Sequence, residues 1–202
     1  MDWQGYLTLG RALTTHDLYA VAFFLIAWMG YSRFSAWYGK RTPSLQGVLD
    51  ELRKTWALRM VERDNRMVDL NIVRNLTRSS QFFASTTLLI LGALIALMGY
   101  VQRAADVVSE LPFVVHASQR LWDFKILLLV GIFVYAFFKF SWSIRQFGFC
   151  AIVIGATRKT PADLKECEQD IARLGLLVSF ASGNFNQGLR SYYFAMAAMS
   201  WF

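Results

Sequence analysis

The clearest feature of the hydrophobic pattern is an uninterrupted apolar run over residues 82–100, FFASTTLLILGALIALMGY, which contains no charged side chain. Arg78 precedes the run and Arg103 follows it. About 20 apolar residues suffice for a helix to cross the hydrocarbon core of a bilayer. Because a segment in lipid must satisfy its own backbone hydrogen bonds, the run predicts a transmembrane helix. The alternative is a core helix of a soluble protein, which the flanking cationic residues disfavour.

Three further apolar segments complete the predicted fold, an all-α integral membrane protein. One of them starts at Trp122, and as a single helix to Ala156 it would be about 50 Å long, more than a bilayer core of about 30 Å needs. The last, from Leu189 to Phe202, would be only about 21 Å long, so we expect its helix to begin earlier or to continue past this sequence. We assign residues 1–202 to a single membrane domain with four transmembrane helices, over about 18–38, 82–101, 122–144 and 186–202.

Two amphipathic segments, about 44–80 and 146–185, predict a helical layer on the cytoplasmic side of the membrane. The first is interrupted near Asp64 and Asn65, after which no Pro or Gly separates it from the long apolar run. One helix therefore rises from the cytoplasm into the membrane. Before the interruption, apolar residues spaced three and four apart form one face: Leu45, Val48, Leu49, Leu52 and Trp56.

The distribution of charge predicts the orientation in the membrane. Nine Lys or Arg residues lie between the first two predicted spans, and two lie in the following loop, 101–121. Since cytoplasmic loops of membrane proteins are enriched in Lys and Arg, the N-terminus is expected outside the cell. The net charge of +7 would suggest nucleic acid in a soluble protein, but a hydrophobic content of 55% argues against that class.

Motifs of catalysis are absent from the sequence, which holds no P-loop, HExxH, GxSxG or CxxC. Cys150 and Cys167 lack zinc-ligand spacing, and the two histidines stand apart from one another. We therefore expect no enzyme, no cofactor and no metal. The aromatic side chains of the third span are expected to face lipid or the interface: Phe133, Phe137, Phe138 and Phe140.

Three segments carry a resemblance to a known family: RNLTRSSQFFASTTLLILGAL, KFSWSIRQFGF and GNFNQGLRSYYFAMAAMSWF. They resemble a family of four-span bacterial membrane proteins, the domain of unknown function numbered 599, over nearly the whole chain and in the same order of spans. The resemblance implies a multi-pass protein of the bacterial inner membrane whose last helix continues past Phe202. It implies no activity.

Polar residues at the expected cytoplasmic ends of the spans form the candidate site, which we place at one depth near the interface. Its members are Arg74, Asn75, Arg78, Arg145, Gln146, Asn184, Asn186 and Arg190. They are interpreted as anchors for lipid phosphate, as a basic vestibule of an oligomeric pore, or as structural hydrogen-bonding groups. A fourth helix beginning near Leu174 would instead put Asn186 and Arg190 in mid-membrane, where polar groups are costly and mark functional sites.

Two functions remain open from the sequence. The first is a homo-oligomeric channel or transporter-like protein with a basic cytoplasmic vestibule. The second is a non-catalytic scaffold that binds anionic lipid headgroups and a partner protein. Both require the phospholipid bilayer, and neither involves nucleic acid.

Overall fold

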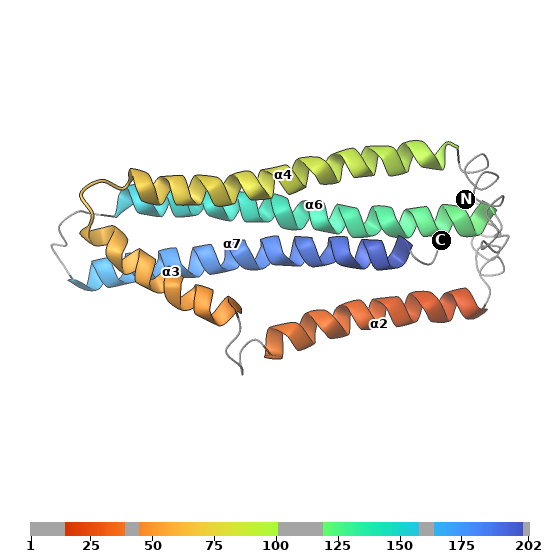
Figure 1. Cartoon of the computed structure of the whole chain (residues 1–202), viewed down its shortest axis with the longest axis horizontal. Helices are drawn as coiled ribbons and strands as arrows, with labels where there is room; N and C mark the ends of the chain where they lie inside the picture. Colours follow the sequence, from red (N-terminus) through yellow and green to blue (C-terminus); the bar gives the residue numbers. More distant parts are fainter. Residues whose placement is uncertain (1–14, 39–44, 101–118, 158–163, 200–202) are drawn as a thin grey trace, which may run out of the picture.

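A computed structural model describes residues 15–38, 45–100, 119–157 and 164–199. Within these ranges the chain is all-helical, as predicted, and contains five helices (Figure 1). They are α2 (Thr15–Tyr38), α3 (Leu45–Glu62), α4 (Met67–Met98), α6 (Gln119–Ala156) and α7 (Leu164–Met199). Two of them, α4 and α6, are long and apolar enough to cross a membrane. Most of the predicted loop 101–121 and the last three residues of the predicted fourth span lie outside the described residues.

Helices α4, α6 and α7 run side by side along the long axis, and α6 packs against both of the others (Figure 1). The chain reverses direction between them, so α4 and α7 run one way while α6 runs the other. Helix α3 packs on the first part of α7. Helix α2 lies beside the second part, where the Trp28 and Phe194 rings stack with centroids 5.8 Å apart. Thus α7 has neighbours along its whole length.

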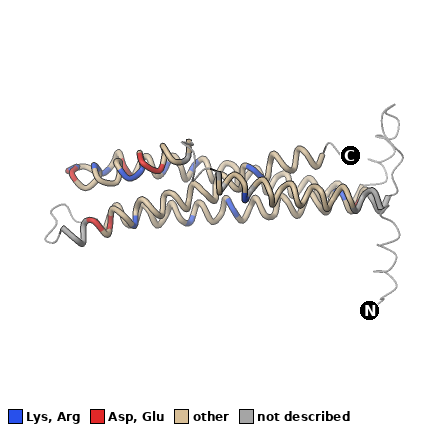
Figure 2. Tube along the Cα trace, turned by 90° about the horizontal axis from the view of Figure 1, so that it is seen from below, with Lys and Arg blue, Asp and Glu red and all other residues tan. Residues whose placement is uncertain are grey.

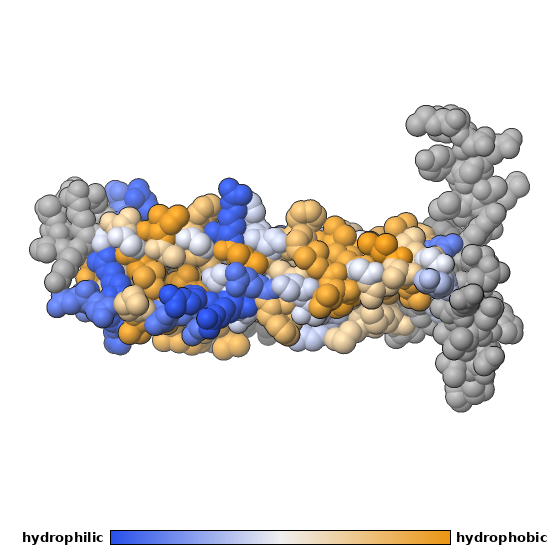
Figure 3. Space-filling view, turned by 90° about the horizontal axis from the view of Figure 1, so that it is seen from above, coloured by the Kyte–Doolittle hydropathy of each residue, from blue (hydrophilic) through white to orange (hydrophobic). Residues whose placement is uncertain are grey.

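Charged side chains gather toward one end of this bundle (Figure 2). Stretches without a charged residue, at 79–100, 126–138 and 191–199, meet at the other end in a shared hydrophobic cluster. The surface in Figure 3 is divided in the same way, with hydrophilic residues concentrated where α4 begins and hydrophobic residues where it ends. The long axis of the molecule is therefore also an axis of polarity.

Helix α7 differs from the expected arrangement. The apolar pattern predicts that a cytoplasmic helical segment over about 146–185 ends before a separate span from about 186, whereas the structure has one helix, Leu164–Met199, that passes through GNFNQG without a break. Gly183 and Gly188 do not adopt a positive φ, so neither ends the helix. A glycine costs a helix only about 1 kcal/mol, and packing of the flanking turns outweighs that cost.

The aromatic residues of α6 also differ from expectation, because two of them form the centre of the bundle. Phe133 and Phe140 are 3% and 0% exposed, whereas Phe138 is 65% exposed. Phe140 stacks on Phe83 of α4, with ring centroids 5.4 Å apart. It also lies so close to Gly188 that a Cβ on that glycine would sit 2.6 Å from the Phe140 ring. Glycine at this position therefore serves the close approach of α6 and α7.

The face of α3 that is buried differs from the face that its apolar pattern predicts. Ala57, Met60 and the neighbouring Val61 are buried against α4, α6 and α7. Leu45 and Leu52, which belong to the predicted apolar face, remain exposed. The tertiary contact is made by the second half of the helix, and the first half leaves hydrophobic side chains on the surface.

We predict that Gly188→Ala lowers the thermal unfolding temperature of the purified protein in detergent. The new methyl group displaces the Phe140 ring, and overpacking of this kind costs about 1–3 kcal/mol. That cost exceeds the roughly 1 kcal/mol that alanine gains over glycine in a helix. Gly183→Ala is the control, because a Cβ there meets no atom within 4 Å. It should leave the unfolding temperature unchanged or raise it, and equal effects of both substitutions would refute the close contact.

Candidate functional site: polar groups along the bundle

Hydrogen bonds between the three long helices align them along the axis. The Ser80 and Ser143 hydroxyls lie 3.2 Å apart in the buried interior. The Ser143 hydroxyl donates to the backbone carbonyl of Ala181 at 2.9 Å. Farther toward the apolar end, the hydroxyls of Thr87 and Tyr192 are 2.8 Å apart. These contacts join α4, α6 and α7 at two levels and define where the predicted site residues lie.

Two of the predicted residues, Gln146 and Asn184, are brought together between α6 and α7. The Asn184 amide nitrogen donates to the Gln146 side-chain oxygen at 2.9 Å and to the carbonyl of Phe180 at 3.0 Å. The Asn184 side-chain oxygen accepts a hydrogen bond from the Lys139 ammonium at 3.3 Å. Both ends of the amide are occupied, so this group links α6 and α7.

The predicted residues of α4 lie on a different surface. Arg74, Asn75 and Arg78 are exposed. At 100° per residue they fall on the side of α4 opposite its buried face, which includes Val73 and Ser80. They therefore point away from α6 within one chain.

The guanidinium of Arg145, another predicted residue, is also on the outside, on α6. It lies 5.9 Å from the ring centroid of Trp142 and 5.8 Å from that of Phe149. These contacts are with aromatic residues of its own helix. Among the residues that the structure describes, the predicted cations of one chain do not surround a common passage.

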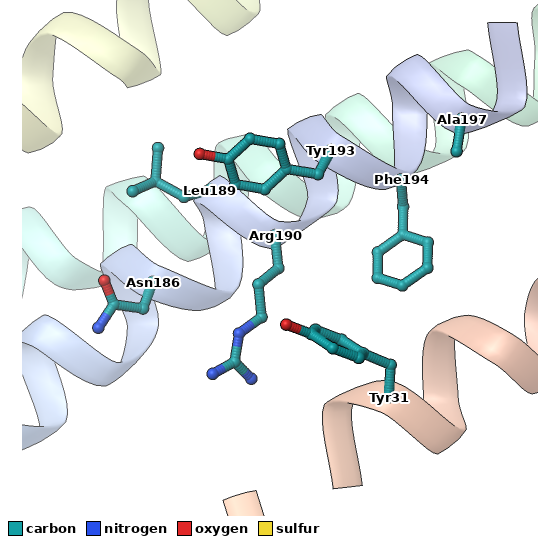
Figure 4. Close-up of a pocket in the computed structure, with 7 residues that line it drawn as sticks. All are labelled: Tyr31, Asn186, Leu189, Arg190, Tyr193, Phe194 and Ala197. Atoms are coloured by element: carbon teal, nitrogen blue, oxygen red, sulfur yellow. The ribbon is translucent and has the colours of Figure 1, made fainter. Parts of the chain in front are cut away.

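Asn186 and Arg190 line a groove between α2 and α7 (Figure 4). The groove has a volume of about 470 Å³. The Arg190 guanidinium reaches across toward α2 and lies 5.9 Å from the ring centroid of Tyr31. The remaining lining is mainly apolar: Leu189, Tyr193, Phe194 and Ala197. This groove is the place where a predicted cation and a predicted amide meet beside open space.

The predicted site residues do not share one level along the axis. Ser80, Ser143 and Ala181 are level with one another. At 1.5 Å per residue, Arg190 lies about 13 Å beyond that level toward the apolar end, and Arg74 about 9 Å on the other side. The separation follows from the continuity of α7, which carries Arg190 in among the charge-free stretches of α4 and α6.

Sequence reasoning misses Asp69, the buried centre of a polar cluster that fastens α3 to α4. Its side chain is 0% exposed. One carboxylate oxygen accepts hydrogen bonds from the Trp56 indole at 2.7 Å and from Arg63. The sequence does carry one signal that Asp69 is buried, which is its position. Asp69 falls on the same helical face as Val73 and Ser80, at spacings of four and eleven residues.

Arg66 makes a second contact at the charged end that the sequence does not reveal. Its guanidinium donates to the backbone carbonyls of Ile154 and Thr157. Carbonyls in the last turn of a helix have no partner within the helix, and a cation at that end also suits the helix dipole. Arg66 therefore ties the start of α4 to the end of α6. Across the described residues, no three His, Cys, Asp or Glu side chains converge as metal ligands.

The fold and these contacts define a class: an all-helical protein with two helices that are candidates to cross a membrane and a charged helical end. A family model described as "Protein of unknown function, DUF599" matches residues 19–202. The chain belongs to this family, which confirms the resemblance seen in its sequence. No curated protein matches the chain, and no solved structure does.

We predict that Asp69→Ala detaches α3 from the bundle. The Trp56 indole loses its acceptor, which costs about 1–3 kcal/mol for a buried donor, whereas the Arg63 side chain, 39% exposed, can turn to water. Limited proteolysis should then cut the connection between α3 and α4, residues 63–66, faster than in the parent protein. Asp170→Ala is the control, since it removes a pair with Arg173, whose side chain is 63% exposed. Exposed ion pairs contribute about 0–1 kcal/mol, so in Asp170→Ala the connection at residues 63–66 should be cleaved at the parent rate. Equal cleavage rates in the two variants would contradict the role of Asp69.

Proposed function

We propose that this protein is a four-span, non-catalytic membrane scaffold that holds a helical layer at the cytoplasmic face and binds anionic lipid and a partner protein there. The observation that carries the proposal is the polarity of the long axis. Charge-free parts of α4, α6 and α7 lie together at one end, and the charged residues gather at the other. Such a division matches a bilayer core on one side and water with basic headgroup contacts on the other.

The contacts of α2 and α7 support four spans rather than two. Trp28 and Phe24 of α2 pack against Phe194 of α7, with ring centroids 5.8 and 5.9 Å apart. Tyr192 of α7 meets Thr87 inside the apolar run of α4. Helices α2 and α7 thus lie beside α4 and α6 where those two helices carry no charged residue. The polar GNFNQG segment of α7 is acceptable there because its Asn184 amide is hydrogen-bonded to α6.

The cytoplasmic layer supplies the surface for a partner. A second groove, of about 620 Å³, lies between α3 and α7. Apolar residues such as Ile171 and Leu176 form much of its wall, and Asp50, Lys54 and Glu168 add charge. Asp50 also accepts a hydrogen bond from Ser179 of α7 at 2.8 Å, which fixes the two walls to each other.

The homo-oligomeric channel stays a prediction, and the interior of one chain gives it little support. Aromatic rings fill the space between α4, α6 and α7, where Phe83, Phe140, Phe185 and Tyr192 contact one another with centroids 5.4 to 5.9 Å apart. A passage would have to form between chains. It would need the outward face of α4, with Arg74 and Arg78, to surround the axis of an oligomer.

We predict that the membrane topology places residue 59 inside the cell and residue 110 outside. In a background with Cys150→Ser and Cys167→Ser, a membrane-impermeant maleimide added to intact cells should label Glu110→Cys and leave Arg59→Cys unlabelled until the cells are opened. The protein should remain in the membrane pellet after alkaline extraction. Release into the soluble fraction, or labelling of both positions from the same side, would overturn the membrane placement.

Reconstitution separates the scaffold from the channel. We expect liposomes that contain the purified protein alone to show no flux of chloride, phosphate or potassium above protein-free liposomes, because the aromatic interior leaves no polar path. An ion flux that Arg78→Ala alters would establish the channel instead. The scaffold would be supported by a partner protein that copurifies with the parent chain. That partner should no longer copurify when Ile171→Asp and Leu176→Asp change the α3/α7 groove.

A further inference from the structure

Within the part of the chain that the structure describes, Arg190 is a cation without an acidic partner in an apolar part of the molecule. It is half-buried, and no carboxylate within the described ranges pairs with it. The hydroxyl of Tyr192, two residues away, bonds to Thr87 within the charge-free run of α4. If the protein spans the membrane as proposed above, on which this inference rests, the Arg190 backbone lies inside the hydrocarbon region and its side chain extends back toward the charged end. Ionisable groups at such depth are costly and mark functional sites.

The groove around Arg190 opens at the surface of the bundle. Tyr31 and Tyr193, on its two sides, are 53% and 65% exposed. Figure 4 shows the Arg190 side chain leaving α7 toward α2, with its guanidinium beside the Tyr31 hydroxyl end. In a bilayer, a groove that opens on the flank of a helical bundle is open to lipid.

The lining of the groove changes from polar to apolar along the axis. Asn186 and Arg190 come first, on the side of the charged end, and Phe194 and Ala197 follow toward the apolar end. A phospholipid of the cytoplasmic leaflet has the same order, with its phosphate toward the cytoplasm and its acyl chains toward the middle of the membrane. The groove and such a lipid are therefore complementary in both charge and polarity.

We propose that this groove is a binding site for one anionic phospholipid of the cytoplasmic leaflet. The lipid phosphate accepts hydrogen bonds from the Arg190 guanidinium, whose planar fork suits a bidentate contact with phosphate. Tyr31 holds the guanidinium by a cation–π contact. The Asn186 amide supplies a further donor, and one acyl chain lies along Phe194 and Ala197. A zwitterionic choline headgroup fits less well, because it brings a second cation to Arg190.

The test is native mass spectrometry of the full chain released from nanodiscs of mixed phosphatidylglycerol and phosphatidylcholine. The parent protein should retain one phosphatidylglycerol in preference to phosphatidylcholine. Arg190→Gln should reduce the retained fraction about tenfold or more, since the charge-assisted contact with phosphate is lost. Arg190→Lys should retain an intermediate fraction. Arg173→Gln is the matched control, an exposed arginine of the same helix that pairs with Asp170, and it should match the parent.

A second variant tests the acyl-chain half without touching the charge. Ala197 is exposed on the groove wall, so Ala197→Trp fills that half and should also reduce retention. Equal retention by the parent, Arg190→Gln and Ala197→Trp overturns the site, as does displacement of the lipid by millimolar inorganic phosphate, which would assign the groove to a free anion. If the lipid site is refuted but the protein still resists alkaline extraction, the proposed scaffold function stands. Loss of the protein from the membrane would instead remove the proposed function.

Discussion

The contact between Phe140 and Gly188 determines how α6 and α7 pack, and most other features of the bundle depend on it. With no Cβ on Gly188, the Phe140 ring lies directly against the α7 backbone. The two helices can then approach closely enough for the Ser143 hydroxyl to reach the Ala181 carbonyl. Small residues at helix contacts serve this purpose in membranes, where packing rather than exclusion of water holds helices together. Gly188 thus fixes the register of α7, and the register fixes the level along the bundle of every polar residue that α7 carries.

The charged end is held together by a different kind of interaction. There, Asp69 and Arg66 lie at the start of α4 and connect it to its neighbours, Asp69 to α3 and Arg66 to the end of α6. The Trp56 indole and the Arg63 guanidinium both donate to one oxygen of the buried Asp69 carboxylate, whereas among the described residues its other oxygen has no hydrogen-bond partner. The bundle is therefore joined by close apolar packing at one end and by directional polar contacts at the other.

The apolar pattern predicts the all-helical fold and the long helices α4 and α6, because charge-free runs of that length leave few alternatives. It fails at GNFNQG, where local composition suggests a boundary. Whether a glycine ends a helix or lies within it depends on its neighbours in space. The neighbour of Gly188 is Phe140, which is 48 residues away in the sequence. The same limit applies to the candidate site. The pattern identifies Asn184 and Arg190 as unusual, but only the register shows that one is satisfied by α6 and the other faces a groove.

The direction of each helix explains why the two deep cations have different surroundings. The Cα–Cβ bonds of a helix tilt toward its N-terminus. Helix α6 begins at the apolar end, so Lys139 is directed away from the charged end, toward Tyr135, and its ammonium donates a part-buried hydrogen bond to the Asn184 side-chain oxygen. Helix α7 begins at the charged end, so Arg190 is directed back toward it, along the flank of the bundle. A cation so directed can extend toward the headgroups, as long basic side chains do near membrane interfaces. Lys139 thus has a partner within the chain, whereas Arg190 is oriented toward the level at which the proposed lipid phosphate would lie.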